Sequence, residues 1–345
     1  MAKDFSTGYL TGLLKPKYRA ISTILGENYV PDKGLDIFLD LNTFISAISS
    51  NKGYLQTLPF ANNAEEDLII SLFGVLRHWR EFAHKWEDVR IFLMYNDFDI
   101  CPTGEREQLK AYLVPYNNKF ENDRYKQLKY YFNEAVNIAK PLFDYLPRSY
   151  FIKCTKYDSF VVPELLADET RDRLIVSDNA MMTAYVFQPN TRMIYSHWCT
   201  RGTTQLSDPL MILQSLTKIE DRIMDAFVQN KVFYTLLNVI IGDKDRGIIG
   251  LPQTSMTAIA NDLLRAVEKK EIPMSPKSIE SVLSVVDKCH HDYIRKNAPL
   301  MDVALHAQMI KPSEVERLKS TLVDKSDIDQ LMKFTIGDIN LMELV

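Results

Sequence analysis

Acidic side chains follow several short apolar runs of this sequence, at the points where those runs end. The acids are Asp40, Asp97, Asp99, Asp158 and Asp178. Carboxylates gathered on one rim repel one another, and a hard cation such as Mg²⁺ is the usual reason for tolerating that repulsion. The set therefore predicts a cation site.

Helix capping is the alternative role for the same acids. Asp is a preferred helix N-cap, and each of these residues precedes a segment that reads as a helix or a turn. Taken singly, an acid at such a point is more often a cap than a ligand. Their occurrence after consecutive runs favours the metal site for the set as a whole.

The apolar runs themselves predict a mainly parallel α/β fold. Five of them read as strands buried on both faces: 35–41, 89–94, 150–154, 173–177 and 191–195. The segments between them carry apolar residues at helical spacing. Strand alternating with helix predicts a doubly wound sheet, in which ligands bind at the carboxyl ends of the strands.

No strand pattern remains after about residue 205, and the rest reads as helices interrupted by Gly and Pro. We predict an N-terminal extension over 1–34, an α/β domain over 35–205 and a helical domain over 206–345.

A glycine-rich segment within the helical region could bind phosphate. Gly242, Gly247 and Gly250 permit tight turns just before a helix predicted over 255–267, and backbone amides at a helix start bind anions. Lys244 and Arg246 add positive charge. The alternative is a plain structural turn between two helices, which also uses Gly and Pro.

These segments, in this order, resemble the 5′ nucleases, the family of flap endonucleases and phage RNase H-like enzymes. The glycine-rich segment resembles their helix-three-turn-helix, here at 236–267. Asp40-x-Asn42, Lys156-Tyr157-Asp158 and Ser177-Asp178 resemble successive acidic motifs of the family. The resemblance implies a PIN-like domain that binds DNA or an RNA/DNA hybrid, two Mg²⁺ or Mn²⁺ ions, and 5′–3′ exonuclease or flap endonuclease activity.

Several acids of the family pattern are replaced in this chain. Phe160 and Val161 stand in the third motif, Ala180 in the fourth, and Arg246 in the glycine-rich one. The metal candidates that remain are Asp40, Asp97, Asp158, Asp178, Asp243 and Asp245. Two-metal hydrolysis needs cations about 3.5 to 4 Å apart. We therefore expect one ion rather than two, and catalysis that is lost or impaired.

The segment 101–148 corresponds to the helical arch of the family, through which a single strand passes. Its lysines and arginines alternate with tyrosines, as single-strand binding requires. A solvated amphipathic helix is the alternative. The nucleic-acid-binding candidates of the whole chain are Lys119, Arg124, Lys126, Gly242, Lys244, Arg246, Gly247 and Gly250.

Composition limits the remaining choices. The net charge of −4 means that phosphate contacts must come from local basic patches. The four cysteines have no paired spacing, which predicts reduced, buried thiols and no zinc ribbon. We expect a cytoplasmic protein, of phage origin by its length and divergence. Three functions stay open: an impaired nucleic-acid-binding protein of the 5′-nuclease fold, an active structure-specific nuclease, and a protein-interaction scaffold in a phage assembly.

Overall fold

The structure is a computed structural model. It describes residues 33–41, 86–96, 148–177, 179–195, 205–206, 230–243, 248–322, 335–336 and 339–340. Among these residues, no helix combines the length and the apolar character needed to cross a membrane.

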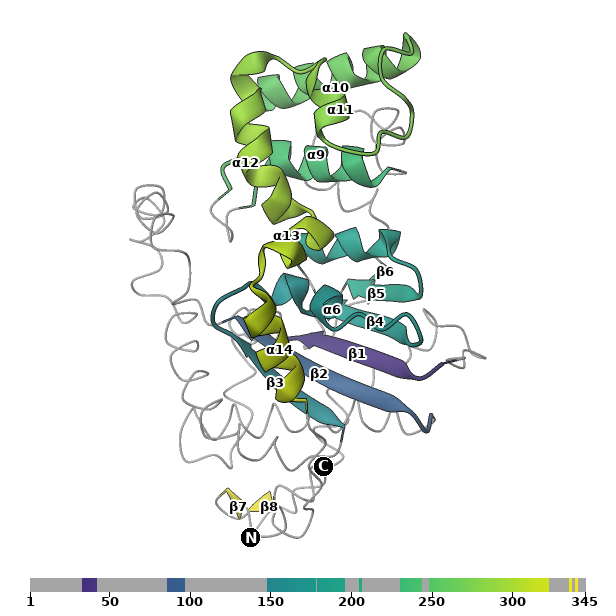
Figure 1. Cartoon of the computed structure of the whole chain (residues 1–345), viewed down its shortest axis with the longest axis vertical. Coiled ribbons are helices and arrows are strands. Elements are labelled where there is room, and N and C mark those ends of the chain that lie inside the picture. Colours follow the sequence, from purple (N-terminus) through teal and green to yellow (C-terminus); the bar gives the residue numbers. More distant parts are fainter. Residues whose placement is uncertain are drawn as a thin grey trace, which may run out of the picture.

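A six-stranded sheet forms the centre of the α/β region (Figure 1). Its strands are β1 (Leu35–Asp40), β2 (Val89–Asn96), β3 (Ser149–Cys154), β4 (Asp172–Ser177), β5 (Thr191–Tyr195) and β6 (Gln205–Leu206). They lie in the order β3-β2-β1-β4-β5-β6, with all pairs parallel except β5 with β6. The prediction of an α/β fold with a mainly parallel sheet is confirmed.

The strand order places a topological switch between β1 and β4. From β1 the chain adds β2 and β3 on one side, and then returns to add β4 and β5 on the other. Leu39 is the register partner of Val176, so the next residues, Asp40 and Ser177, come side by side at the carboxyl ends. Ligands of open parallel sheets bind at such switch points.

The continuous apolar run of β1 is explained by burial on both faces. All six residues of the strand are buried. Phe38 stacks on Phe92 of β2 with ring centroids 4.7 Å apart, and Phe92 stacks on Tyr150 of β3 at 5.2 Å. Aromatic pairs of this kind stabilise neighbouring strands beyond their burial alone.

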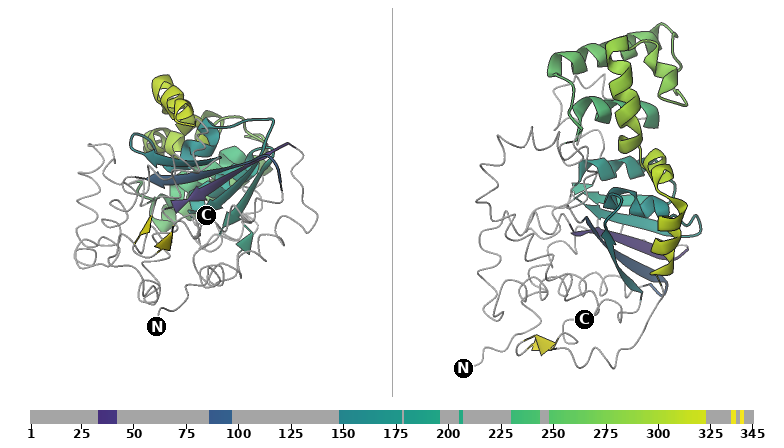
Figure 2. Two further views of the ribbon diagram at one scale, coloured as in Figure 1. Left: turned by 90° about the horizontal axis from the view of Figure 1, so that it is seen from below. Right: turned by 60° about the vertical axis from the view of Figure 1, so that its left-hand side comes forward.

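Helices form most of the described C-terminal region. They are α9 (Lys231–Ile241), α10 (Gln253–Glu268), α11 (Glu280–Leu283), the short η5 (Lys288–His290), α12 (His291–Met301), α13 (Val303–Met309) and α14 (Pro312–Ser320). Figures 1 and 2 show α9 to α12 beyond the β5–β6 side of the sheet, with α13 and α14 leading back towards β3.

The returning helices pack against the segment that follows β3. This segment forms η3 (Ser159–Val161) and α6 (Val162–Leu165), and α13 contacts both. An ion pair of 2.5 Å joins Lys156 to Glu314 of α14. On the other side, α9 packs against η4 (Ala180–Phe187). The apolar side chains of these elements form one continuous core, although the chain division at 205/206 stays a prediction.

Three short strands were not predicted from the sequence. The strand signal ends before β6, and β7 (Thr335–Ile336) and β8 (Ile339–Asn340) form a hairpin where only helix was expected. Each strand has two residues, which is too short for an alternating pattern to appear.

Candidate metal site and nucleic-acid interface

Asp40 ends β1 at the topological switch, and its side chain is buried. Ser177, the last residue of β4, donates a hydrogen bond from Oγ to Oδ2 of Asp40 over 2.6 Å. The same Oγ accepts the backbone N–H of Asn179 at 3.0 Å. The carboxylate is thus held from the neighbouring strand by a neutral donor.

Asp158 follows β3 and takes the capping role that the sequence left open as an alternative to metal binding. Its Oδ1 accepts the N–H of Phe160 at 2.9 Å, so Asp158 caps η3. The same oxygen accepts a hydrogen bond of 3.1 Å from Nδ2 of Asn96, at the end of β2. At η4 the N-cap is Asn179, whose Oδ1 accepts the N–H of Met181 at 3.0 Å.

Cys154 lies at the same edge of the sheet as the two acids, because β1 and β3 run parallel to β2 and Asp158 bonds to Asn96 at the end of β2. It is the last residue of β3 and is fully buried. Burial raises the pKa of its thiol well above the usual value, and the nearby charges of Asp158 and Asp40 raise it further. Asp40 and Asp158 supply carboxylate oxygens as donors at this edge. Cys289, by contrast, is exposed, and the prediction of a buried thiol was wrong there because η5 lies on the surface.

The donor chemistry at this edge fits a hard divalent cation. Carboxylate oxygens are the ligands that Mg²⁺ and Mn²⁺ prefer. Three further candidates, Asp97, Asp178 and Asp245, lie outside the described residues. Within the described ranges, no three His, Cys, Asp or Glu side chains come together as a metal-binding group. The metal assignments therefore stay predictions.

Phe160 and Val161, where the resemblance would place a second acid of the third motif, belong to the core in this chain. Phe160 and Val161 have no exposed surface. The ring of Phe160 meets that of Tyr185 edge-on, with centroids 6.0 Å apart, and the Tyr185 hydroxyl donates to the Phe160 carbonyl at 2.6 Å. Neither side chain can serve as a ligand. Ala180, which replaces an acid of the fourth motif, opens η4.

The loop after α9 is closed by direct contact between two glycines. Gly242 has a φ of +82°, and a Cβ there would lie 2.2 Å from the nitrogen of Gly250. A Cβ on Gly250 would lie 1.9 Å from the carbonyl oxygen of Ile241. Asp243 and Ile248 exchange backbone hydrogen bonds of 2.8 Å in each direction. This part of the loop is a compact turn in which both glycines are sterically required.

Tyr293 on α12 also holds this loop, which sequence reasoning missed. Its hydroxyl donates to the carbonyl of Ile249, whose own side chain is exposed. Partial burial raises the pKa of Tyr293 to about 12. The helix that follows the loop was predicted over 255–267 and is found as α10, Gln253–Glu268.

The remaining nucleic-acid candidates cannot be placed. Lys119, Arg124, Lys126, Lys244, Arg246 and Gly247 lie outside the described residues. Of the predicted set, Gly242 and Gly250 are described, and their contact with phosphate stays a prediction.

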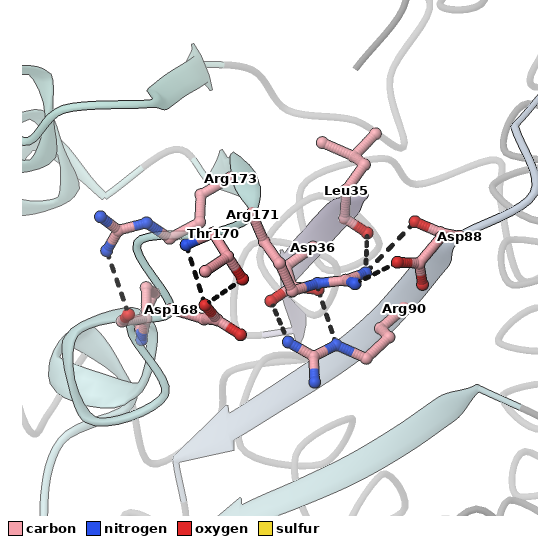
Figure 3. A network of polar contacts seen from close by, with 9 residues as sticks. Leu35, Asp36, Asp88, Arg90, Asp168, Thr170, Arg171 and Arg173 are labelled. Carbon is pink, nitrogen blue, oxygen red and sulfur yellow. Dashed lines mark hydrogen bonds and ion pairs between the residues drawn. The ribbon is translucent and has the colours of Figure 1, made fainter. Parts of the chain in front are cut away.

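A charged network at the opposite, amino edge of the sheet was also missed (Figure 3). Asp36, buried within β1, accepts hydrogen bonds from Arg90 at 2.7 and 2.6 Å and from Arg171 at 2.7 Å. Arg171 also pairs with Asp88 at 2.5 Å. At Gly34, with a φ of +48°, a Cβ would lie 2.5 Å from Arg171. An acid inside an otherwise apolar strand was the available signal, because a buried charge needs partners.

Comparison with known proteins gives structural neighbours and no sequence relatives. No family model and no curated protein matches the chain. The chain is similar to a zinc-bound T5 5′-exonuclease, with a TM-score of 0.49 and 12% identity. It is also similar to a pseudo-enzyme form of the bacteriophage T5 flap endonuclease, solved with product DNA and metal ions, with a TM-score of 0.47 and 12% identity. Each match covers 84% of this chain and 98% of the other.

Proposed function

We propose that this chain is a nucleic-acid-binding protein of the 5′-nuclease fold whose catalysis is lost or strongly impaired. Its ligand is DNA or an RNA/DNA hybrid. The duplex binds at the loop after α9, with the backbone amides at the start of α10 and the charges of Lys244 and Arg246 on the phosphates.

The observation that carries the proposal is the chemistry at the carboxyl edge of the sheet. The two described acids are hydrogen-bonded by neutral side chains: Asp40 by Ser177 and Asp158 by Asn96. Phe160 and Val161 are core residues where the resemblance would place a second acid of the third motif. In the described part of this edge, these two carboxylates alone would carry too little charge to hold two cations close together.

One Mg²⁺ or Mn²⁺ ion is the cofactor that suits this edge. Asp40 and Asp158 supply hard oxygen donors, and Asp97, Asp178, Asp243 and Asp245 are the further candidates. A single bound cation would neutralise phosphate charge and orient a strand. It would not supply the paired activation of water and leaving oxygen on which two-metal cleavage depends.

An active metal-dependent flap endonuclease is the second candidate. The observation that favours it is the position of Asp40 at the topological switch, on the same edge as Asp158. Acids outside the described residues would then complete the metal site. The protein-scaffold alternative predicts no affinity for nucleic acid at all.

Fluorescence anisotropy tests the proposed function directly. Labelled 5′-flap, 5′-overhang and RNA/DNA duplexes are titrated with the wild-type chain in EDTA, Mg²⁺ and Mn²⁺. We expect saturable binding in EDTA that weakens as salt rises, since phosphate contacts release counterions. Absence of binding to every duplex at low salt would contradict the proposal and favour the scaffold.

A further inference from the structure

Asn96 ties the end of β2 to the segment that carries Asp158. It is the last residue of β2, and its register partner is Cys154, which ends β3. Asp158 comes four residues later along the chain. Asn96 Nδ2 donates to Asp158 Oδ1 at 3.1 Å, and Asn96 Oδ1 accepts the backbone N–H of Ser159 at 2.6 Å.

The orientation of this amide is fixed by its partners. The N–H of Ser159 can only donate, so it must face the oxygen of the Asn96 amide. The amide nitrogen is then directed at Asp158, where a carboxylate oxygen accepts it. An amide satisfies both neighbours at once, because it carries a donor and an acceptor on the same group.

An aspartate at position 96 would not be equivalent. One of its oxygens could still accept from Ser159, but the other would face Asp158 Oδ1 at hydrogen-bond distance. Two carboxylates that close repel each other unless a proton or a cation lies between them. The Asn96 amide therefore makes the arrangement of Asp158 independent of metal.

We infer that Asn96 is a positioning residue that holds Asp158 in place without a cation. An aspartate at position 96 would need a bound cation to do the same. This inference rests on the proposed function, because it explains how the acidic edge keeps its shape with few acids. The inference also states how the formation of the site depends on metal. Metal is a ligand that the folded edge can accept, not a component that the edge needs in order to form.

Thermal unfolding of Asn96→Asp in EDTA and in Mn²⁺ tests the inference. Measurements are made at about pH 8, so that the two carboxylates do not share a proton. In EDTA we expect a lower Tm than for the wild type. Mn²⁺ should restore it, because the new carboxylate joins Asp158 in binding the cation. Calorimetry should show Mn²⁺ affinity at least about tenfold above that of the wild type, a change of the size that residues around a metal site produce.

A matched variant separates charge from packing. Asn96→Ala removes the clamp without adding a charge, so it should lower the Tm with no gain in Mn²⁺ response. If Asn96→Asp does not fold in EDTA, its folding on addition of Mn²⁺ is the readout that tests the inference.

Three outcomes would overturn the inference: a wild-type Tm for Asn96→Asp in EDTA, an Mn²⁺ response no greater than that of Asn96→Ala, or an Asn96→Asp variant that stays unfolded in both EDTA and Mn²⁺. These outcomes are independent of duplex binding by the wild type. Failure of the wild type to bind nucleic acid would instead contradict the proposed function, and it would not change the interpretation of the Mn²⁺ measurements.

Discussion

Ser177 and Asp40 meet across the boundary between β4 and β1, where the Ser177 hydroxyl donates to the Asp40 carboxylate over 2.6 Å. Both side chains are buried, and both end their strands at the topological switch of the sheet. The position at which parallel sheets bind ligands is therefore occupied by one acid and a neutral donor that holds it.

Ser177→Ala should destabilise the fold. The substitution removes a hydrogen bond to a buried carboxylate, and loss of a bond to a charged group costs about 1.5–3 kcal/mol. Urea unfolding should show this loss at neutral pH. The matched control is Ser281→Ala, since the Ser281 hydroxyl donates to the Ser278 carbonyl on the surface. We expect the control to change stability by at most about 0.5 kcal/mol. Equal effects for the two variants would contradict a special role for Ser177.

Asp36→Asn should lower the free energy of unfolding more than most single substitutions. Asp36 is fully buried and pairs with Arg90 and Arg171, so its neutralisation takes one counter-charge from each guanidinium and leaves Arg171 with the more exposed Asp88. Breaking a buried pair from one side costs about 3–5 kcal/mol. The exposed pair Glu280–Arg295 is the control, and Glu280→Gln should lower the free energy of unfolding far less. A similar, small loss in both variants would show that the amino-edge network does not stabilise the sheet.

The stability of the chain should fall in acid partly through Asp88. The hydrogen bond from Arg171 is the main cause that lowers the pKa of this carboxyl below its ordinary value of 3.8. A depressed pKa in the folded state contributes stability above the ordinary value, and that contribution is lost as the pH falls through the folded pKa. Asp88→Asn should therefore flatten the loss of stability below about pH 4, modestly, because the side chain is largely exposed. An unchanged acid profile would contradict the assignment.

Lys244→Ala combined with Arg246→Ala should weaken binding to unrelated duplexes alike. Phosphate contacts carry no sequence information, and each one adds to the salt dependence of binding. We expect the slope of log affinity against log salt to flatten by up to about two units. Anisotropy across a salt series measures this change. An unaltered affinity and slope would rule out the loop after α9 as a duplex anchor.

The strands β1, β2 and β4 could be predicted from sequence because nearly all of their residues are buried. β3 and β5 are only partly buried, but each still carries a short apolar run. β1 is buried on both faces, so its apolar run is nearly continuous, and its predicted range of 35–41 differs from the observed one by a single residue. The two-residue strands β6, β7 and β8 carry no such signal. Local pattern thus identifies strands only when they are long enough to bury a run of side chains.

The partners of the predicted acids could not be found in the same way. Asp40 was identified from its place at a strand end, but its hydrogen bond to Ser177 depends on β1 lying beside β4, and no local pattern gives that order. The contact between Asp36 and Arg171 spans 135 residues, and that between Tyr293 and Ile249 spans 44. Such pairs follow from tertiary packing and appear only in the folded chain.

Cleavage of a 5′-flap duplex in a single turnover, in Mg²⁺ and then in Mn²⁺, tests the central claim most directly. We predict that the purified chain cleaves not at all, or at least about a thousandfold more slowly than a typical 5′ nuclease, the loss expected when one strong electrostatic element is removed. Asp40→Asn and Asp178→Asn should then leave any residual rate unchanged. Robust metal-dependent cleavage by the wild type that disappears in Asp178→Asn would contradict the claim and establish an active nuclease.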